Sequence, residues 1–326
     1  MYNRIRKLKQ QTTSKQHGGT VEPKYVFIVG LPRTGTKLTV NVLENCQEKS
    51  CYITPENFFL GRVLRPGIRH KMRKIGDMSI DTNVRQFIDH MYAGKFFGVY
   101  WWQLVDGKLG IDKETMLQRM LHSDRSDKAI YTILLQAYAR TADDLILGDK
   151  SGPNLYRVPT LLEWFPDAKI IHTFRDPRAI LASEFKKRHR LLQTAKNRNP
   201  SPFLVKLSSP FLSLVIVLYI TIAWLYAARL HQKYKKLYPD NYYLSKYEDL
   251  VTEPEKNVKE LCEFLDIECH SDMLSPSQID SSYAHNRGTG FDKQALTRWK
   301  NHLQPWMNTW LLFWGKKYLR EFGYTA

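Results

Sequence analysis

The 326-residue sequence contains only four cysteines, namely Cys46, Cys51, Cys262 and Cys269. Four are too few for a dense disulfide framework, which argues against a disulfide-stabilised fold. Their spacing matches no zinc-binding pattern, which argues against a zinc-stabilised fold. The ten histidines show no metal-ligand spacing either, so the sequence predicts no metal site. Cysteines without an evident pairing pattern indicate a reducing compartment, and we therefore expect a cytoplasmic protein.

The first residues lack the apolar core of a secretory signal. Met1 to Gln16 is basic and polar, and we interpret residues 1–20 as a disordered basic arm. The sequence also shows no internal repeat and no low-complexity tract. We therefore predict one folded domain over residues 21–326, a length that can bury a large core.

Acidic residues are missing from a long central segment. From Phe185 to Pro239 there is no Asp or Glu, whereas 11 Lys and Arg occur there, and the whole chain has a net charge of +17. The positive electrostatic field of such a protein attracts nucleotides, nucleic acids, acidic glycans and anionic lipids. A basic protein that binds a polyanion or a membrane surface is therefore one functional hypothesis, and a solvated basic surface without a partner is the alternative.

The same segment contains 22 residues without a charge, from Leu207 to Ala228. Its length and apolarity are sufficient for a membrane-spanning helix. If the residues on both sides of it build one pocket, however, a single span would place them on opposite sides of the bilayer. We therefore predict a buried core helix, with contact between 207–228 and a membrane surface as the alternative.

Short apolar runs alternate with helical patterns along most of the chain. The runs predict strands at Tyr25–Val29, Cys51–Ile53, Leu145–Leu147, Lys169–Phe174 and Tyr242–Leu244. The helical patterns cover Thr36–Cys46, Lys128–Arg140, Asn154–Trp164, Pro177–Arg188 and Pro254–Leu265. This alternation predicts an α/β fold with a central parallel sheet, helices on both faces and a P-loop-like nucleotide-binding core. Residues 57–125 show no strong period and are interpreted as an insertion that covers the sheet.

The first predicted strand leads into a Gly-rich turn and then a helix. Free backbone N–H groups gather at such a junction, beside the positive helix end, so it favours phosphate binding. The segment Gly30-Leu-Pro-Arg-Thr-Gly-Thr-Lys nearly spells a Walker A loop. That motif requires Lys directly after the second Gly, whereas Thr36 precedes Lys37 here. A P-loop kinase-like enzyme therefore remains only as an alternative.

A second strand-to-helix junction follows at Ile170 to Ser183. Asp176 and Pro177 are typical of an N-cap and a first helical residue. Ser183 lies seven residues beyond Asp176, which corresponds to nearly two turns and roughly 10 Å. A long Arg175 side chain can cover that gap and share one phosphate with the Ser183 hydroxyl. Two such junctions predict a ligand with phosphates at two separate places.

The two junctions together resemble those of the sulfotransferase family, which binds 3′-phosphoadenosine-5′-phosphosulfate. The resemblance is closer to the carbohydrate and tyrosyl-protein type than to the cytosolic type. It implies transfer of a sulfuryl group to an acceptor hydroxyl or amine, without a metal. It also implies a 5′-phosphosulfate loop formed by Arg33, Thr34, Gly35, Thr36, Lys37 and Leu38, and a 3′-phosphate site formed by Arg175, Ser183, Arg287 and Gly288.

The resemblance also implies the catalytic residues. Cytosolic members use His as the base, whereas the other type uses Glu after the second strand, where this sequence has Glu56. Lys150 and Arg33 would supply positive charge to the reacting groups. Thr54-Pro55-Glu56 also predicts a helix start, and His70 is the next candidate base. We expect a small-molecule, glycan or lipid acceptor held by residues 57–125, and no nucleic-acid partner.

Overall fold

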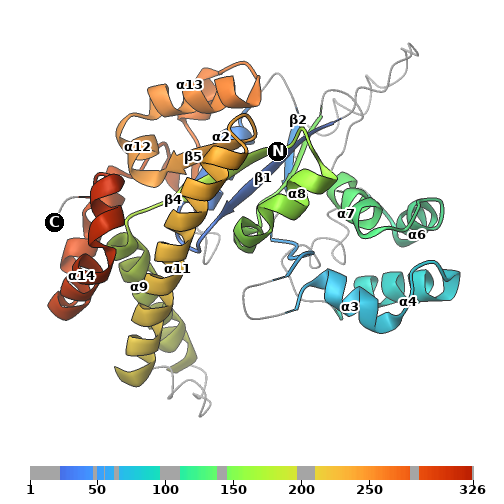
Figure 1. Cartoon of the computed structure of the whole chain (residues 1–326), viewed down its shortest axis with the longest axis horizontal. Coiled ribbons are helices and arrows are strands. Elements are labelled where there is room, and N and C mark those ends of the chain that lie inside the picture. The colour runs from blue at the N-terminus through green and yellow to red at the C-terminus, as the bar shows by residue number, and fades with distance from the viewer. Residues whose placement is uncertain are drawn as a thin grey trace.

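The computed structural model describes residues 23–46, 50–54, 56–61, 66–95, 111–137, 145–196, 210–279 and 286–324. The predicted arm 1–20 lies outside these residues. A five-stranded parallel sheet forms the centre of the molecule (Figure 1), with the strand order β2-β3-β1-β4-β5. The strands are β1 (Lys24–Gly30), β2 (Ser50–Thr54), β3 (Leu145–Asp149), β4 (Lys169–Phe174) and β5 (Tyr242–Lys246). The predicted fold class is therefore confirmed.

Alternate residues of β1 face two separate apolar cores. Val26 and Ile28 pack with α2 (Thr36–Leu43) and α13 (Pro254–Leu265) on one face. Phe27 and Val29 belong to the larger core on the other face. A strand buried on both faces requires a continuous apolar run, which explains why β1 is Val-Phe-Ile-Val at its centre.

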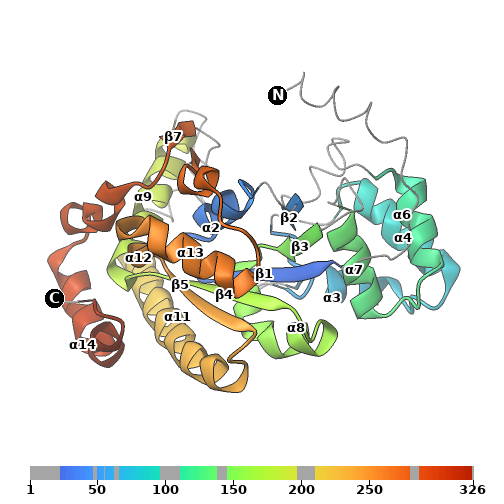
Figure 2. The same cartoon turned by 90° about the horizontal axis from the view of Figure 1, so that it is seen from above.

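The other helices and a short hairpin surround the sheet. They are α3 (Ile68–Ile75), α4 (Asp81–Tyr92), α6 (Lys113–Leu121), α7 (Asp127–Gln136), α8 (Val158–Trp164), α9 (Pro177–Lys196), α11 (Pro210–Leu237), α12 (Tyr247–Thr252) and α14 (Pro305–Glu321), with a small hairpin of β6 (Ser277–Ile279) and β7 (Asn286–Thr289). Figure 2 shows α3, α4, α6 and α7 grouped at one end of the sheet, and α14 at the other.

Several predicted helix boundaries were wrong. The predicted helix Asn154–Trp164 is a 3₁₀ turn (Gly152–Arg157) followed by α8. α2 ends at Leu43 because the next two residues form tighter turns, in which the Cys46 N–H donates to the carbonyl of Leu43. α9 continues to Lys196, beyond the predicted end at Arg188.

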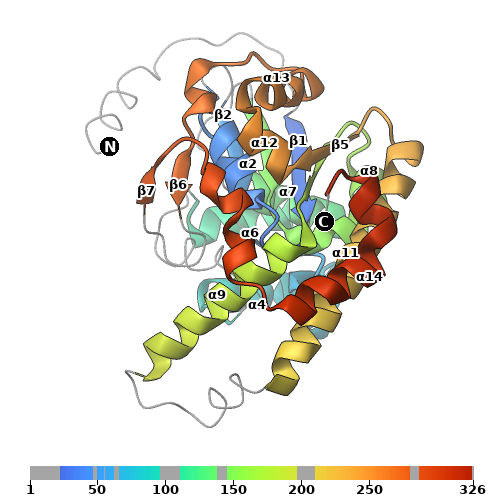
Figure 3. The same ribbon diagram turned by 90° about the vertical axis from the view of Figure 1, so that its left-hand side faces the viewer.

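From Pro210 onwards the uncharged run lies in α11, and residues 207–209 lie outside the described residues. One face of this helix packs against the core. Val217 and Ala227 are fully buried, and the Trp224 indole N–H donates to the carbonyl of Arg175 at 2.9 Å. α11 leads directly into β5, whose Tyr242 pairs with Ile170 of β4, so both flanks of the helix belong to one sheet. The prediction of a buried core helix is thus confirmed in part, because the opposite face, with Phe211 and Ile222, is exposed. Figure 3 shows α8, α11 and α14 on one side of the strands, and α2 and α13 on the other.

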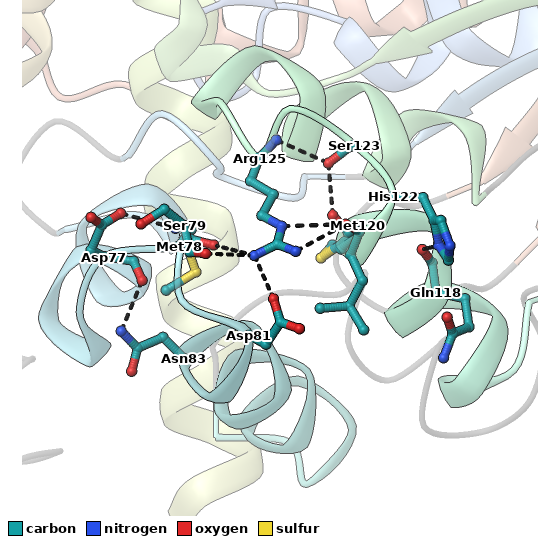
Figure 4. A network of polar contacts seen from close by, with 11 residues as sticks. Asp77, Met78, Ser79, Asp81, Asn83, Gln118, Met120, His122, Ser123 and Arg125 are labelled. Atoms are coloured by element: carbon teal, nitrogen blue, oxygen red, sulfur yellow. Dashed lines mark hydrogen bonds and ion pairs between the residues drawn. The ribbon is translucent and has the colours of Figure 1, made fainter.

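The described part of residues 57–125 contains three helices, so the interpretation of this region as lacking a strong period was wrong. In α4, the buried residues Val84, Phe87, Ile88 and Met91 follow the helical spacing i, i+3, i+4, i+7. Arg125 connects the start of α4 to the end of α6. Its guanidinium donates to the carbonyls of Ser79 and Leu121 and pairs with Asp81 (Figure 4).

Candidate functional site

A cleft of about 260 Å³ opens where β1 and β4 end and where α2 and α9 begin. Parallel strands deliver their carboxyl ends to one edge of the sheet, and ligands bind at this edge in open α/β folds. The cleft brings together seven of the residues predicted to bind phosphate, namely Arg33, Gly35, Thr36, Lys37, Leu38, Arg175 and Ser183. The two junctions found in the sequence therefore contribute to a single cavity.

The turn after β1 has the backbone of an anion-binding loop. Arg33 (φ 72°) and Gly35 (φ 98°) both adopt left-handed conformations. Thr34 lies below the loop rather than in the cleft, because its hydroxyl donates to the carbonyl of Leu31 and lies 2.7 Å from the hydroxyl of Thr173. Only the main chain of Thr34 is therefore placed to contribute to a site on the cleft side.

Gly35 is required by a close approach as well as by its φ angle. A Cβ atom at this position would lie 2.6 Å from Cδ2 of Tyr247. We expect Gly35→Ala to lower the free energy of unfolding by about 1–3 kcal/mol more than Gly94→Ala. Gly94 is a matched control, because it also has a left-handed φ (68°) but no atom within 4 Å of the added carbon. Urea denaturation measures both, and equal losses would contradict this role of Tyr247.

The side chains of the two junctions contact each other directly. Arg33 Nε donates to Ser183 Oγ at 2.9 Å, although the two residues are 150 positions apart. The sequence-based prediction pairs Ser183 with Arg175 instead. Arg175 and Ser183 both line the cleft, and the hydrogen bond to Ser183 comes from the first loop.

Arg175 is held in place on several sides. Its guanidinium donates to the carbonyls of Arg33 (3.2 Å) and Ala295 (3.0 Å), and it lies 3.9 Å from the centre of the Tyr247 ring. Its Nε is buried and has no hydrogen-bond partner within the described residues. An arginine fixed in this way, with one N–H left over, fits an additional anionic oxygen.

The start of α9 is fixed by a buried ion pair. Asp176 Oδ1 accepts from the backbone N–H of Arg178 at 2.8 Å, which confirms Asp176 as the predicted cap. The Arg178 guanidinium returns to Asp176 Oδ2 and lies 4.3 Å from the centre of the Trp299 ring. This stack attaches the C-terminal segment to the rim of the cleft.

Further basic side chains, to which the sequence-based prediction gives no site role, also line the cleft. They are Lys186, Lys187 and Arg190; Arg298 and the His302 imidazole line it as well. The first three follow Ser183 on α9 at i+3, i+4 and i+7, so they lie on the same helix face. This spacing was present in the sequence, within the segment that lacks acidic residues.

Glu56 and Lys150 form an ion pair beside the cleft, and neither is among the residues that line it. Lys150 Nζ lies 3.1 Å from Glu56 Oε1, and the two side chains follow the neighbouring strands β3 and β2. The Lys150 side chain is 14% exposed and that of Glu56 is 42% exposed. The segment after Lys150 also approaches the first loop, since a Cβ atom at Gly152 would lie 2.5 Å from the carbonyl oxygen of Gly30. His70 is exposed on α3 and is not a cleft residue.

Beneath this pair lies a buried carboxyl group. Asp149 accepts hydrogen bonds from the hydroxyls of Tyr131 (2.8 Å), Ser151 (2.8 Å) and Thr54 (3.2 Å), and from the Asn154 amide (3.0 Å). Burial raises the pKa of Asp149 to about 6, although these hydrogen bonds oppose the shift. The network links the ends of β2 and β3, which carry Glu56 and Lys150.

The two C-terminal site residues lie in β7. Gly288 has a left-handed φ of 115° and is not among the residues that line the cleft; Gly290 is among them. The side chain of Arg287 lies outside the described residues. Within the described part of the chain, no group of three His, Cys, Asp or Glu side chains is arranged to hold a metal ion.

Comparison with known protein families gives a match over most of the chain. The sequence model of the sulfotransferase family matches residues 23–272. The omega-hydroxy-beta-dihydromenaquinone-9 sulfotransferase of Mycobacterium bovis is 27% identical over 150 residues, which is 45% of this chain and 36% of that protein. The corresponding protein of Mycobacterium tuberculosis gives the same values. The match thus spans about a third of the length of these relatives.

Solved structures give the same result for the fold. The sulfotransferase domain of the curacin biosynthetic pathway superposes with a TM-score of 0.50 at 17% identity, over 87% of this chain and 93% of that one. The sulfotransferase domain of the Synechococcus PCC 7002 olefin synthase also has a TM-score of 0.50 at 17% identity, over 90% and 92% of the two chains.

Proposed function

Because the chain belongs to the sulfotransferase family, we propose that it transfers a sulfuryl group from 3′-phosphoadenosine-5′-phosphosulfate to the hydroxyl of an apolar acceptor. Family membership leaves the kinase alternative without support. It agrees with the order of Thr36 and Lys37, which departs from a Walker A loop.

The observation that carries the proposal is the meeting of two phosphate junctions in one cationic cleft. Arg33 and Ser183 are in contact, and Arg175 lies against the same loop with a buried N–H that lacks a partner. A ligand with one phosphate would need only one helix start. Two helix starts, from α2 and α9, fit a nucleotide that carries phosphate at both its 3′ and 5′ positions.

The proposed assignment of residues follows from this placement. The backbone of residues 33–38 would hold the 5′-phosphosulfate. Arg175 and Ser183, together with Arg287 and Gly288 of the C-terminal segment, would bind the 3′ phosphate. Because the hydroxyl of Thr34 points away from the cleft, Thr34 would contact the 5′-phosphosulfate through its main chain only.

The proposed reaction is an in-line displacement at sulfur. The acceptor oxygen forms a bond to sulfur while the bond from sulfur to the 5′-phosphate oxygen breaks, and the acceptor proton passes to the Glu56 carboxylate. Lys150 and Arg33 would stabilise the negative charge that develops on the departing oxygen. Lys150 lies 3.1 Å from Glu56, so one cation is already beside the proposed base.

Among small-molecule, glycan and lipid acceptors, we propose a lipid-like molecule with a terminal hydroxyl. The mycobacterial relatives are named for an omega-hydroxylated menaquinone derivative, and 45% of this chain aligns with them. All four cysteines are free thiols, which supports a cytoplasmic site for the reaction.

Calorimetry tests the nucleotide assignment. We expect 3′-phosphoadenosine-5′-phosphate to bind without magnesium and more tightly than ATP or adenosine 5′-phosphate. Arg175→Ala should weaken this binding by about 2 kcal/mol, the scale of a lost charge-assisted hydrogen bond. Arg229→Ala, at an exposed position of α11 outside the cleft, is the matched control. Equal affinities for the nucleotides with and without the 3′ phosphate would overturn the assignment of Arg175 and Ser183.

A further inference from the structure

An apolar surface is exposed along the first half of α11 and on the neighbouring α14. We call it the apolar tip; it comprises Phe211, Val215, Tyr219 and Ile222 of α11, with Phe313 and Trp314 of α14. Phe211 and Phe313 are each 74% exposed and Ile222 is 66% exposed. Single exposed apolar residues are common on soluble proteins, but a contiguous group of large ones marks a contact surface.

The two helices run parallel and in a fixed register. The Trp310 indole N–H donates to Thr221 Oγ1 at 3.2 Å, and the Gln232 amide donates to Glu321 at 2.7 Å. Both pairs are separated by the same 89 positions, so equivalent turns of α11 and α14 lie side by side (Figure 3). Phe313 and Trp314 are therefore level with Trp224 and Leu225, near the middle of α11, and the exposed apolar residues of α11 continue from there towards its start.

The second halves of both helices are basic. We call this region the basic collar; it comprises the exposed residues Arg229 and Lys233 of α11 and Lys316, Lys317 and Arg320 of α14. α11 contains no acidic residue, and α14 contains only Glu321, at its last position. Polarity thus changes along the helix axes, from apolar and aromatic to cationic.

We propose that the apolar tip and the basic collar dock the protein on one face of an anionic lipid bilayer. The tip would enter the acyl region, and the collar would lie against the lipid phosphates. The order of the two zones along the helices matches the order of acyl chains and phosphates across a leaflet. Aromatic side chains such as Tyr219 and Trp314 are typical of the boundary between these layers.

α11 does not cross the bilayer in this arrangement. It is the one helix of the described chain that is long and apolar enough to do so. Its other face, however, packs into the core through Val217, Ile220 and Trp224. Contact from one side leaves this packing intact.

The topology places the α11 part of the tip on the same side of the sheet as the cleft. Trp224 bonds to the carbonyl of Arg175, directly after the end of β4, so it marks the level of the strand carboxyl ends. α11 has 28 residues and spans about 42 Å, whereas the five residues of β5 span about 17 Å. The residues of α11 before Trp224 therefore extend beyond the edge of the sheet where the cleft opens (Figure 1).

If the proposed function holds, this orientation affects how the acceptor reaches Glu56 and Lys150. Docking through the tip and the collar would bring the strand ends, and with them Glu56 and Lys150, to the level of the lipid headgroups, because Trp224 lies between Ile222 and Arg229 on α11. An acceptor with a long apolar chain could then present its hydroxyl without leaving the bilayer completely. The docking surface itself is defined by α11 and α14 and does not depend on the reaction.

Vesicle co-sedimentation of the full chain, without nucleotide, tests the docking surface. We expect binding to phosphatidylcholine vesicles that contain phosphatidylglycerol, and weaker binding to phosphatidylcholine alone. The double variant Ile222→Ser/Phe313→Ser should bind at least about 10-fold more weakly. Both positions are largely exposed, so the fold should survive. Ile80→Ser is the matched control, because Ile80 is 51% exposed but lies at the start of α4.

A second variant tests the collar. Lys233→Glu/Lys317→Glu should remove the preference for phosphatidylglycerol while leaving binding to neutral vesicles nearly unchanged. Unchanged vesicle binding by the tip variant would overturn the proposal. A loss of self-association, measured by sedimentation, without a loss of vesicle binding would also overturn it, because the tip would then be an interface between copies. Calorimetry of the tip variant with 3′-phosphoadenosine-5′-phosphate keeps this result separate from the proposed function.

Discussion

Replacing Glu56 with glutamine should lower kcat by about 10²- to 10⁴-fold and leave the affinity for the bisphosphate nucleotide nearly unchanged. Glutamine retains the size of the side chain and an oxygen that can accept from Lys150, which lies 3.1 Å away in the wild type. An amide is not basic enough, however, to take the acceptor proton. The expected effect is therefore on the chemical step alone.

Steady-state turnover with the natural acceptor, together with calorimetry on the nucleotide, measures the two quantities separately. Glu163→Gln is a suitable control, because Glu163 is an exposed glutamate on α8. If Glu56→Gln turned over within a few-fold of the wild type, the base would lie elsewhere. His70 would then be tested next, although it is exposed on α3 and does not line the cleft.

The sheet and both phosphate junctions could be predicted because their signals are local. Each strand is a short apolar run, and in each junction the strand, turn and helix start are adjacent in sequence. Asp176 is an example, since its cap to Arg178 involves residues only two positions apart. Local patterns of this kind specify the fold class and the edge of the sheet at which ligands bind.

The arrangement of side chains within the cleft could not be predicted in the same way. The bond between Arg33 and Ser183 joins residues 150 positions apart, and the stack of Arg175 on Tyr247 joins the residue after β4 to the start of α12. Neither pair has a sequence pattern. The inward turn of Thr34 likewise depends on Thr173, which lies on a neighbouring strand.

The helices of residues 57–125 are a different case, because their pattern was present. Met116, Leu117 and Met120 of α6 show the helical spacing of a buried face, as the buried residues of α4 do. The helices are short, and glycines and basic residues separate them, so the period does not persist over a long window. A window of about three turns would have identified them.

Arg33→Ala should lower kcat by about 10²- to 10³-fold, the scale of removing one donor to a charge that develops in the transition state. The main-chain carbonyl of Arg33 would still accept from Arg175, so the loop should keep its position. Part of the affinity for the nucleotide would also be lost, since the Arg33 side chain lines the same cleft. The loss in kcat should exceed the loss in affinity, because the positive charge is needed most when the sulfuryl group departs.

Arg33→Lys is the matched variant, because it keeps the charge and replaces one side chain by another that also carries a Cβ at this left-handed position (φ 72° in the wild type). It should recover most of the kcat lost in Arg33→Ala, although a lysine cannot reproduce the donor geometry of Nε towards Ser183, at 2.9 Å in the wild type. Single-turnover rates at saturating nucleotide would separate chemistry from binding. If Arg33→Ala reduced only the affinity, with kcat unchanged at saturation, Arg33 would be a binding residue and the developing charge would be stabilised by Lys150 and the helix ends.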